Sequence, residues 1–462
     1  MNSLDRITAN DARSPDARVH EKAALVRLGL LGAAVVALTL ATPFAFWAGG
    51  DDAYMGFAVA TGLAALSATY VAEGTKTANA LWLIVAIAVL VRIILLFIDP
   101  LLSTDVYRYI WDGKVQAAGI NPYLYVPMDD ALAPLRDTAI YPHINRANYA
   151  VTIYPPVAQM FFFAVTRVGE NVVTMKLALL ACEAVTATLI VLLLRRLGRP
   201  ATRVVAYLWH PLPIWEIANN GHVDALMIAL MMLGIWLALI GRPLRGALSV
   251  ALGTLVKPFA ALALPAIWRP WDWKLPLAVL AAAALCYVPY LSAGWGVFGF
   301  LTGYLRDEGL DTGANIWPLA VWRAIAGIWP GDLAAYVVIA ALIIAALSLR
   351  AAFRQPRSIE TSLADINRLL LAALLLLSPN YPWYFLVVTP FVALVGGAPL
   401  WAVTIGAVVL QEEATWDFYV PLLIRKSALY AVFFLAWAFV AWRASRARPS
   451  PHVSDDERSD AR

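Results

Sequence analysis

Long apolar runs, separated by short polar segments, extend along most of the chain. Runs of about 20 residues match the roughly 30 Å hydrocarbon core of a bilayer when they are helical, whereas a strand of a transmembrane barrel needs only about 10 alternating residues. The pattern therefore predicts an all-α polytopic membrane protein with about twelve full spans plus short or re-entrant helices. The clearest runs are 26–47, 79–98, 172–194, 222–240, 275–291, 333–350 and 427–443, and the weaker ones are 54–70, 203–217, 363–378, 383–395 and 400–411.

The composition agrees with this class of protein. Of the 462 residues, 61% are hydrophobic and 14% are charged, whereas a soluble domain has roughly 25% charged residues. The composition therefore argues against a soluble enzyme. The net charge of +4 comes mainly from arginines in short loops and indicates orientation in the membrane rather than nucleic-acid binding. Cys182 and Cys286 lie inside apolar runs and are expected as core residues, without a disulfide framework.

Clusters of Lys and Arg predict which ends of the spans face the cytoplasm. With these clusters inside, both termini are cytoplasmic, residues 1–25 form an N-terminal segment, 26–443 the membrane domain and 444–462 a disordered tail. The assignment requires that 155–168 does not cross the membrane. It also requires that 246–268 breaks at Lys257-Pro258 into two half-length helices, which membranes tolerate beside a cavity. The clusters lie at 6–22, 195–203, 242–245, 269–274, 350–357 and 443–448.

Two polar segments are then expected outside: a first outer loop, 99–155, and a second outer loop, 292–315. Long loops in compact folds are usually functional. In the first, Ser103 or Thr104 can cap a helix from Asp105 to Ala118, which Gly119 can end.

On that helix Asp105, Arg108, Tyr109 and Asp112 share one face, because they follow the i, i+3, i+4, i+7 pattern. The whole face is therefore expected to project from the membrane surface. A carboxylate at the membrane surface can take a proton from a sugar or lipid hydroxyl, and an adjacent arginine can hold a phosphate. A solvated amphipathic helix without function is the alternative explanation.

A set of short motifs gives the chain a family resemblance. They are TDVYRYIWDG (104–113), NPY (121–123), LRD (135–137), YPHIN (141–145), IYPPVAQ (153–159), GHVDA (221–225), VKPFA (256–260) and SPNYPWY (378–384). Together they resemble the GT-C glycosyltransferases and, within them, the GT87-type α-mannosyltransferases that use polyprenyl-phosphate-linked sugars. The resemblance covers about residues 80–390. It implies a GT-C helical bundle, an outward-facing site and transfer of a hexose, usually with inversion.

The resemblance also assigns candidate roles. It carries the catalytic base over to Asp105, with Asp112 as a second catalytic candidate. Lys257 lies in the middle of an apolar run, where a charge costs about 2.5–3.5 kcal/mol, so it needs an anionic partner. That partner is either the donor phosphate, bound together with Arg108 and Arg306, or the carboxylate of Glu183. For Glu183, Arg92 is the favoured structural partner.

The remaining candidates are expected to contact substrate. His222 and Asp224 either bind sugar hydroxyls or cap the helix that follows. Trp383 and Tyr384 either stack on a sugar or belong to the interfacial aromatic belt. No metal or cofactor is indicated, although an acidic cluster at Glu412, Glu413 and Asp417 is chemically able to bind a hard cation. The substrate-binding candidates are Tyr109, Asn121, Tyr154, His222, Asp224, Trp383 and Tyr384.

The leading hypothesis is a hexosyltransferase of the inner membrane, acting at its outer face. Its expected partners are a polyprenyl-phosphate-linked sugar, which the resemblance implies is mannose, a lipid or glycan acceptor and membrane lipids, but no nucleic acid. The sequence has no nucleotide-binding fingerprint, which agrees with a lipid-linked donor. One competing hypothesis is a secondary transporter or a flippase for lipid-linked saccharides, because these also use broken helices and charges at mid-membrane. The other is an acyl- or aminoarabinose-type transferase on the same scaffold.

Overall fold

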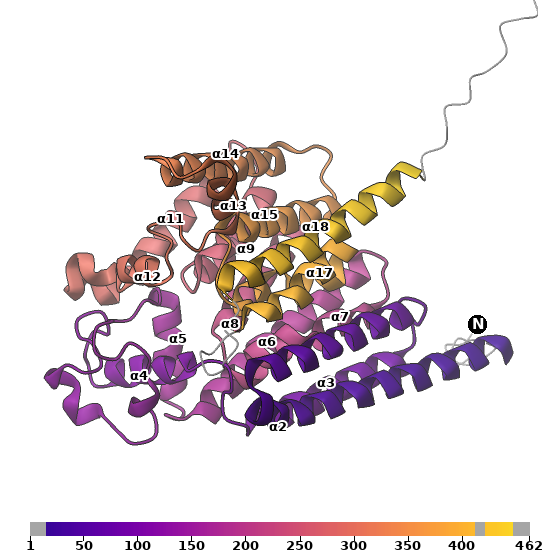
Figure 1. Cartoon of the computed structure of the whole chain (residues 1–462), viewed down its shortest axis with the longest axis horizontal. Helices are drawn as coiled ribbons and strands as arrows, with labels where there is room; N and C mark the ends of the chain where they lie inside the picture. The colour runs from indigo at the N-terminus through magenta and orange to yellow at the C-terminus, as the bar shows by residue number, and fades with distance from the viewer. Residues whose placement is uncertain (1–14, 412–420, 447–462) are drawn as a thin grey trace, which may run out of the picture.

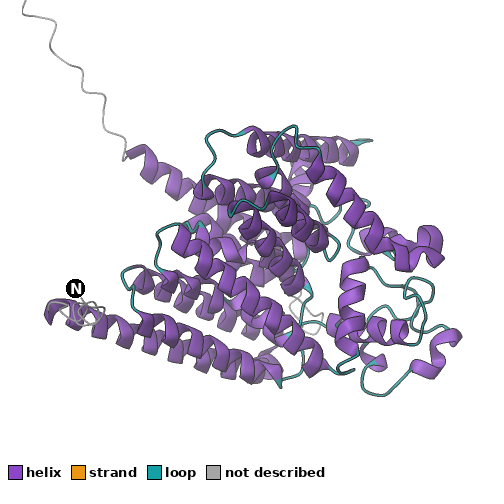
Figure 2. Ribbon diagram, turned by 180° about the vertical axis from the view of Figure 1, so that it is seen from behind, coloured by secondary structure: helices purple, strands orange, loops and turns teal. Residues whose placement is uncertain are grey.

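The computed structural model describes residues 15–411 and 421–446. Within these ranges every regular element is a helix and no strand occurs (Figures 1 and 2), so the all-α prediction is confirmed for them. The expected disordered tail from 447 and the acidic cluster at Glu412, Glu413 and Asp417 lie outside the described residues.

Among the described residues, six helical stretches are long and apolar enough to cross a membrane, or seven if one bent pair of helices is counted as a span. The pair is η4 (Pro213–Asn219) and α8 (Asp224–Leu239), which meet at 115°. The prediction of about twelve spans is therefore not confirmed. The six are α2 (Pro15–Glu73), α3 (Ala78–Leu96), α6 (Val172–Arg196), the stretch Lys274–Asp307, α14 (Asp332–Phe353) and α18 (Leu422–Arg446).

Several runs that the sequence pattern assigns to full spans fold as short helices. The predicted runs 383–395 and 400–411 correspond to the helical stretches Pro382–Leu394 and Ala398–Leu410, which each have fewer than 18 residues. At 1.5 Å per residue, each is about 20 Å long, which is well short of the bilayer core. Hydrophobicity alone did not separate them from spans, since a buried short helix is as apolar as a crossing one. Segment 155–168 does behave as expected, because α5 (Pro156–Thr166) has only 11 residues.

Helix α2 is divided near its middle. Its 59 residues would make a straight helix about 90 Å long, three times the thickness of the bilayer core. Gly50, at φ 62° and ψ −152°, interrupts it with a backbone conformation that favours glycine. The apolar runs 26–47 and 54–70 thus form two helices on either side of Gly50, as the sequence pattern predicts.

The two outer loops lie at the same end of the molecule. In Figure 1, α4 (Asp105–Ala117), α5 and α12 (Leu301–Asp307) gather at the left, whereas the start of α2 and the end of α18 lie at the right. Much of the second loop is helical, because η6 (Val288–Phe298) leads into α12.

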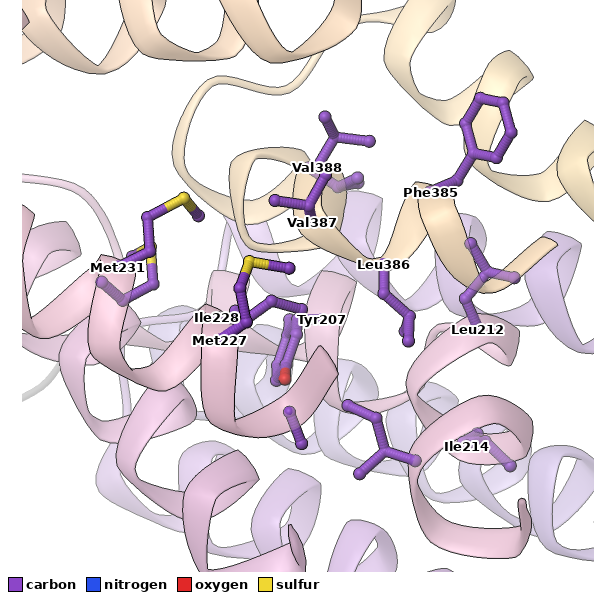
Figure 3. Close-up of a cluster of buried hydrophobic side chains, with 14 of the residues drawn as sticks. Tyr207, Leu212, Ile214, Met227, Ile228, Met231, Phe385, Leu386, Val387 and Val388 are labelled. Carbon is purple, nitrogen blue, oxygen red and sulfur yellow. The ribbon is translucent and has the colours of Figure 1, made fainter. Parts of the chain in front are cut away.

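The core lies where short helices meet between the long ones. Figure 3 shows buried side chains from three segments packed together: residues 207–214, the first half of α8, and η7 (Pro382–Val388). Helix α8 also packs on α9 (Pro243–Thr254), and a Cβ at Gly246 would lie 2.6 Å from the Gly234 carbonyl oxygen. Small residues at this crossing let the two backbones come close.

The other helices connect these elements. They are η1 (Asp130–Leu135), η2 (Tyr141–His143), η3 (Ala201–Val204), α7 (Val205–Leu208), η5 (Pro258–Ala263), α10 (Leu264–Ile267), α11 (Lys274–Tyr287), α13 (Trp317–Ala326), α15 (Ile359–Leu377), α16 (Thr389–Leu394), α17 (Ala398–Gly406) and η8 (Ala407–Leu410).

One buried ion pair fixes α3 to α6. Arg92 Nη2 lies 2.6 Å from Glu183 Oε1, and Arg92 Nη1 donates to the Leu208 carbonyl at 2.6 Å. The pairing of Arg92 with Glu183 is confirmed. The alternative, in which Glu183 is the partner of Lys257, is wrong, because the Glu183 carboxylate is already neutralised by Arg92.

Candidate active site

Four breaks in helical structure converge beneath the first outer loop. They are the start of α4, the turn between η4 and α8, the break between α9 and η5, and the turn between α15 and η7. The elements are linked by contacts between His222 and Asp105, between Lys257 and Asp224, and between Lys257 and Tyr384. The fold therefore brings together candidates that are spread over about 280 residues of sequence.

Asp105 begins α4, as predicted, and keeps one open side. Its backbone N–H donates to Ser103 Oγ at 3.3 Å, while Thr104 makes no side-chain cap. Oδ1 of Asp105 accepts a hydrogen bond from Asn145 Nδ2 at 3.1 Å, and Oδ2 accepts one from Tyr154 Oη at 3.2 Å. The side chain remains 21% exposed. Neutral donors thus orient the carboxylate without covering it.

Tyr154 and Tyr109 form the aromatic floor under Asp105. Burial, together with the nearby Asp105 carboxylate, raises the pKa of Tyr154 well above 10, so the phenol stays protonated and donates to Asp105. Tyr109 is fully buried and stacks on Phe162 with ring centroids 4.6 Å apart. Its oxygen accepts from the Val223 N–H at 3.5 Å. Tyr109 therefore has a packing role in this arrangement.

The other end of the same helix face is covered. Arg108 Nε donates to Asp112 Oδ1 at 2.8 Å, and both Arg108 Nη atoms reach the Ala150 carbonyl at 3.2 Å. Gln159 Nε2 donates to Asp112 Oδ2 at 2.9 Å. The expectation that the whole face projects from the membrane surface is wrong, because α5 packs on it. Gly113 allows this approach, since a Cβ there would lie 2.5 Å from the Phe162 carbonyl oxygen.

The motif GHVDA forms the turn between η4 and α8. Gly221 has φ +69°, a conformation that favours glycine. The preceding asparagines anchor the turn to the segment before α4: Asn219 Oδ1 accepts from the Leu101 N–H at 2.9 Å, and Asn220 Oδ1 accepts from the Leu102 N–H at 3.0 Å. The turn therefore holds the start of α4 beside His222 and Asp224.

Lys257 lies at the predicted break between α9 and η5, and its partner is Asp224. The Nζ atom lies 2.5 Å from Asp224 Oδ2 and 5.5 Å from the centroid of the Tyr384 ring. The Asp224 side chain is 2% exposed and that of Lys257 is 15% exposed, so the cation keeps some accessible surface. Sequence reasoning missed this pair, although both residues flank breaks in neighbouring apolar runs.

His222 is enclosed and does not reach the surface. It is fully buried, and its ring stacks on Trp383 with centroids 4.5 Å apart. Nδ1 lies 3.8 Å from Asp105 Oδ2, and Nε2 lies 3.3 Å from Glu216 Oε2. Trp383 and Tyr384 are partly exposed, so their rings contribute to the accessible wall of the site.

The second outer loop closes the other side. Arg146 Nε lies 3.0 Å from Asp307 Oδ2, and its Nη2 lies 3.3 Å from Glu308 Oε1. Glu308 Oε2 accepts from Asn380 Nδ2 at 2.7 Å. Asn145 ends the YPHIN motif and Arg146 follows it, but no sequence pattern indicated their contacts.

Two further candidates lie toward this rim. Arg306 is exposed on α12, one residue before the Arg146 contacts begin. Asn121 Nδ2 donates to the Tyr290 carbonyl at 3.0 Å and to Ser292 Oγ at 2.8 Å. In this structure, Asn121 joins the first outer loop to the second. Among the residues that the structure describes, no group of three His, Cys, Asp or Glu side chains is placed to hold a metal ion.

Comparisons with known proteins agree with the resemblance. A family model described as "Alpha-(1->6)-mannopyranosyltransferase, N-terminal domain" matches residues 22–272, a range that includes Asp105, His222, Asp224 and Lys257 but not the 378–384 turn. The chain is 28% identical to Alpha-(1->6)-mannopyranosyltransferase A of Mycobacterium tuberculosis over 320 residues, which are 63% of this chain and 61% of the relative.

A second relative gives the same picture over a shorter range. The chain is 28% identical to Alpha-(1->6)-mannopyranosyltransferase A of Corynebacterium glutamicum over 205 residues, which are 43% of this chain and 41% of the relative. The chain thus spans 61% and 41% of the lengths of these two curated relatives. No solved structure matches it.

Proposed function

The chain belongs to the family described as Alpha-(1->6)-mannopyranosyltransferase, N-terminal domain, and from that premise we propose that it is an integral-membrane glycosyltransferase. It moves a hexose, mannose by the family relationship, from a polyprenyl-phosphate donor to a hydroxyl of a lipid or glycan acceptor. The observation that carries the proposal is the Asp105 carboxylate. It is oriented by two neutral donors and is 21% exposed. The turn between η4 and α8 carries both His222, which faces Asp105, and Asp224, which pairs with the partly exposed cation of Lys257.

The reaction is a single displacement. Asp105 takes the proton of the acceptor hydroxyl while the hydroxyl oxygen attacks the anomeric carbon. The bond between that carbon and the phosphate oxygen breaks, and the electron pair leaves with polyprenyl phosphate. The configuration at the transferred carbon is therefore inverted. No protein nucleophile is needed, because one base and a neutralised leaving group are sufficient chemistry.

The contacts of the three basic candidates favour Lys257 for the donor phosphate. Arg108 directs its donors to Asp112 and Ala150 inside a buried cluster. Lys257 has one carboxylate partner and three N–H donors, so it can bind a phosphate oxygen while keeping Asp224. Arg306 is exposed on the rim, where water and salt screen its charge, so it is the weaker alternative for the same group. The partly exposed rings of Trp383 and Tyr384 provide faces on which a sugar can stack.

The basic loops and the arrangement of the helices support one orientation of the protein in the membrane. We place the site at the outer face of the inner membrane and both termini in the cytoplasm. In support, the loops that carry the site lie at the opposite end of the molecule from the start of α2 and the end of α18 (Figure 1). A position under a loop at one end also favours an enzyme over a transporter or flippase, which would bind its substrate near the middle of the membrane between repeats.

The test is transfer by purified protein in lipid nanodiscs, with radiolabelled polyprenyl-phosphate mannose and a short α-mannoside acceptor. Asp105→Asn keeps the size of the side chain but removes the base, so the transfer rate should fall by about 10²–10⁴-fold. Asp130→Asn, at an exposed aspartate of the same loop, should transfer at the wild-type rate. Near-normal transfer by Asp105→Asn would overturn the proposal.

A further inference from the structure

One oxygen of the candidate base is held by the first residue of a turn, residues 145–150. Asn145 Nδ2 donates to Asp105 Oδ1 at 3.1 Å. The next residue, Arg146, has φ 53°, and this left-handed conformation is uncommon for a residue that carries a Cβ. Such a conformation persists only where the surrounding structure holds it. The turn therefore places a strained residue directly beside one that contacts Asp105.

The later part of the turn is fixed to the first outer loop and to α4. The Arg146 carbonyl accepts from the Ala150 N–H at 3.0 Å, which closes the turn. The Ala147 carbonyl accepts from the Met128 N–H at 2.9 Å. The Ala150 carbonyl in turn accepts from both Nη atoms of Arg108. These backbone contacts hold the end of the turn independently of the Arg146 side chain.

The φ angle of Arg146 then decides where Asn145 points. This angle is the rotation about the bond that joins the fixed part of the turn to the peptide group of Asn145. Relaxation from φ 53° to the common right-handed value of about −63° would turn that peptide group by roughly 115°. The Asn145 amide would then be carried away from Asp105. The hydrogen bond to Asp105 therefore depends on an unusual backbone conformation one residue further along the chain.

The side chain of Arg146 is held by the second outer loop. Its Nε lies 3.0 Å from Asp307 Oδ2, and its Nη2 lies 3.3 Å from Glu308 Oε1. The Glu308 side chain is 5% exposed and is itself held by Asn380, so its attraction for Arg146 is screened less than that of a surface pair. Tyr149 Oη also donates to Asp307 Oδ2, at 3.2 Å. These contacts supply the restraint that a left-handed arginine requires.

We propose that Asn145 and Arg146 are positioning residues for the candidate base, and that the second outer loop acts on Asp105 through them. The two acidic residues of that loop hold Arg146 in its left-handed conformation, and this conformation directs Asn145 Nδ2 at Asp105 Oδ1. With Tyr154 on the second oxygen, the plane of the carboxylate is fixed for the acceptor hydroxyl. The inference rests on the proposed function, because it takes Asp105 as the base.

Two substitutions at Arg146 separate the backbone conformation from the lost charge. Arg146→Ala and Arg146→Gly both remove the guanidinium and both leave Glu308 without its cation, so the effect of that carboxylate is common to the two. Alanine is still strained in the left-handed conformation, whereas glycine adopts it readily. Arg146→Ala should therefore lower kcat about 10-fold, and Arg146→Gly by no more than about threefold, since less of the alignment of Asp105 is lost.

A double-mutant cycle tests whether Arg146 acts through Asn145. Asn145→Ala removes the donor itself and should lower kcat about 10-fold, with donor KM within about twofold of wild type, because neither residue is placed at the donor phosphate. If Arg146 only aims Asn145, then Arg146→Ala changes nothing further once residue 145 is alanine. The double variant should therefore also be about 10-fold slower than wild type, whereas two independent effects would multiply to about 100-fold.

Trp271 provides a matched control for the exchange of alanine and glycine. It is also a non-glycine residue with positive φ, 74°. It is 78% exposed in the segment between α10 and α11, outside the contacts that build the site. Trp271→Ala and Trp271→Gly should therefore have equal kcat values, and this pair measures any general effect of glycine at a left-handed position.

The experiment measures kcat, donor KM and thermal unfolding of the full chain in nanodiscs, with the donor and acceptor that test the proposed function. The value of kcat is expressed per folded molecule, so that a variant that is only less stable does not count as slower. Wild-type kcat in Asn145→Ala, equal kcat in Arg146→Ala and Arg146→Gly, or multiplied losses in the double variant would each overturn the inference. If Asp105→Asn remains active in the same assay, the proposed function fails instead.

Discussion

The two ends of helix α4 carry the same residue type on the same face and have different surroundings. Asp112 is 1% exposed and is neutralised by Arg108, with Gln159 on its second oxygen. Asp105, two turns earlier, is 21% exposed and is held by uncharged donors. Helical periodicity shows that the two carboxylates share a face, but packing of α5 over one end decides which carboxylate can meet a substrate.

The largest effect should separate these two aspartates directly. Asp105→Asn should reduce the transfer rate by about 10²–10⁴-fold, because it removes the base, while thermal unfolding of the purified protein stays near wild type. Asp112→Asn should do the reverse. It leaves the buried Arg108 without its counter-charge, which destabilises the fold by roughly 3–5 kcal/mol, while kcat per folded molecule stays within a few-fold. Loss of transfer in well-folded Asp112→Asn would instead make Asp112 the base.

The next largest effect concerns Lys257. A carboxylate neutralises its charge, as Asp112 neutralises that of Arg108, but the Lys257 side chain is also partly accessible. Lys257→Met should weaken binding of the polyprenyl-phosphate donor by about 10–100-fold, the loss of one charge-assisted hydrogen bond. It should also lower stability, because Asp224 is then buried without a cation. Adding Asp224→Asn should restore stability but not donor affinity. Donor titrations and unfolding curves on the single and double variants check both. Unchanged donor affinity in the double variant would show that Lys257 only pairs with Asp224 and does not bind the donor phosphate.

A smaller effect should come from the donors that orient Asp105. Tyr154→Phe removes one hydrogen bond to Oδ2, whose length is 3.2 Å, and should lower kcat about 5–10-fold. Donor KM should not change, since the ring remains in place. Tyr123→Phe, which removes a phenol that donates to the Tyr154 carbonyl at 2.7 Å, is the control, because Tyr123 contacts Tyr154 but not Asp105. Equal kcat losses in the two variants would show that Tyr154 acts through packing.

The smallest effect is expected at Arg306. It is exposed on α12, so Arg306→Gln should change donor affinity by no more than about twofold, as is usual for a surface substitution. A loss of 10-fold or more would give this rim cation a share of the donor phosphate and would reduce the role assigned to Lys257. The measurement is the same donor titration, repeated at two salt concentrations because exposed charges are screened.

The sequence predicted features that depend on local chemistry. The break at Lys257-Pro258, the short helix after the Pro-Pro pair and the start of α4 at Asp105 all follow from residue types next to one another. The Arg92–Glu183 pair was also predictable, because an arginine in an apolar run needs an acid. The number of spans was not, since a buried short helix and a crossing helix have the same hydropathy.

Contacts between distant segments were not predictable from these patterns. Lys257 and Asp224 are 33 residues apart, one at the break between α9 and η5 and the other at the start of α8. Asn145 reaches Asp105 from 40 residues away. Nothing in a single apolar or polar pattern specifies which of several acids a lysine within an apolar run meets, because that depends on how the half-length helices pack.

The anchoring contacts of the site imply an order of assembly during synthesis. Asn219 and Asn220, which fix Leu101 and Leu102, lie 118 residues further along the chain. The 378–384 turn is held by Lys426 of the last helix, whose Nζ donates to Asn380 Oδ1 at 2.8 Å. A chain made from its N-terminus therefore completes its catalytic end last. Unfinished chains in the membrane lack an assembled site, and loss of α18 should disable an aspartate more than 300 residues upstream.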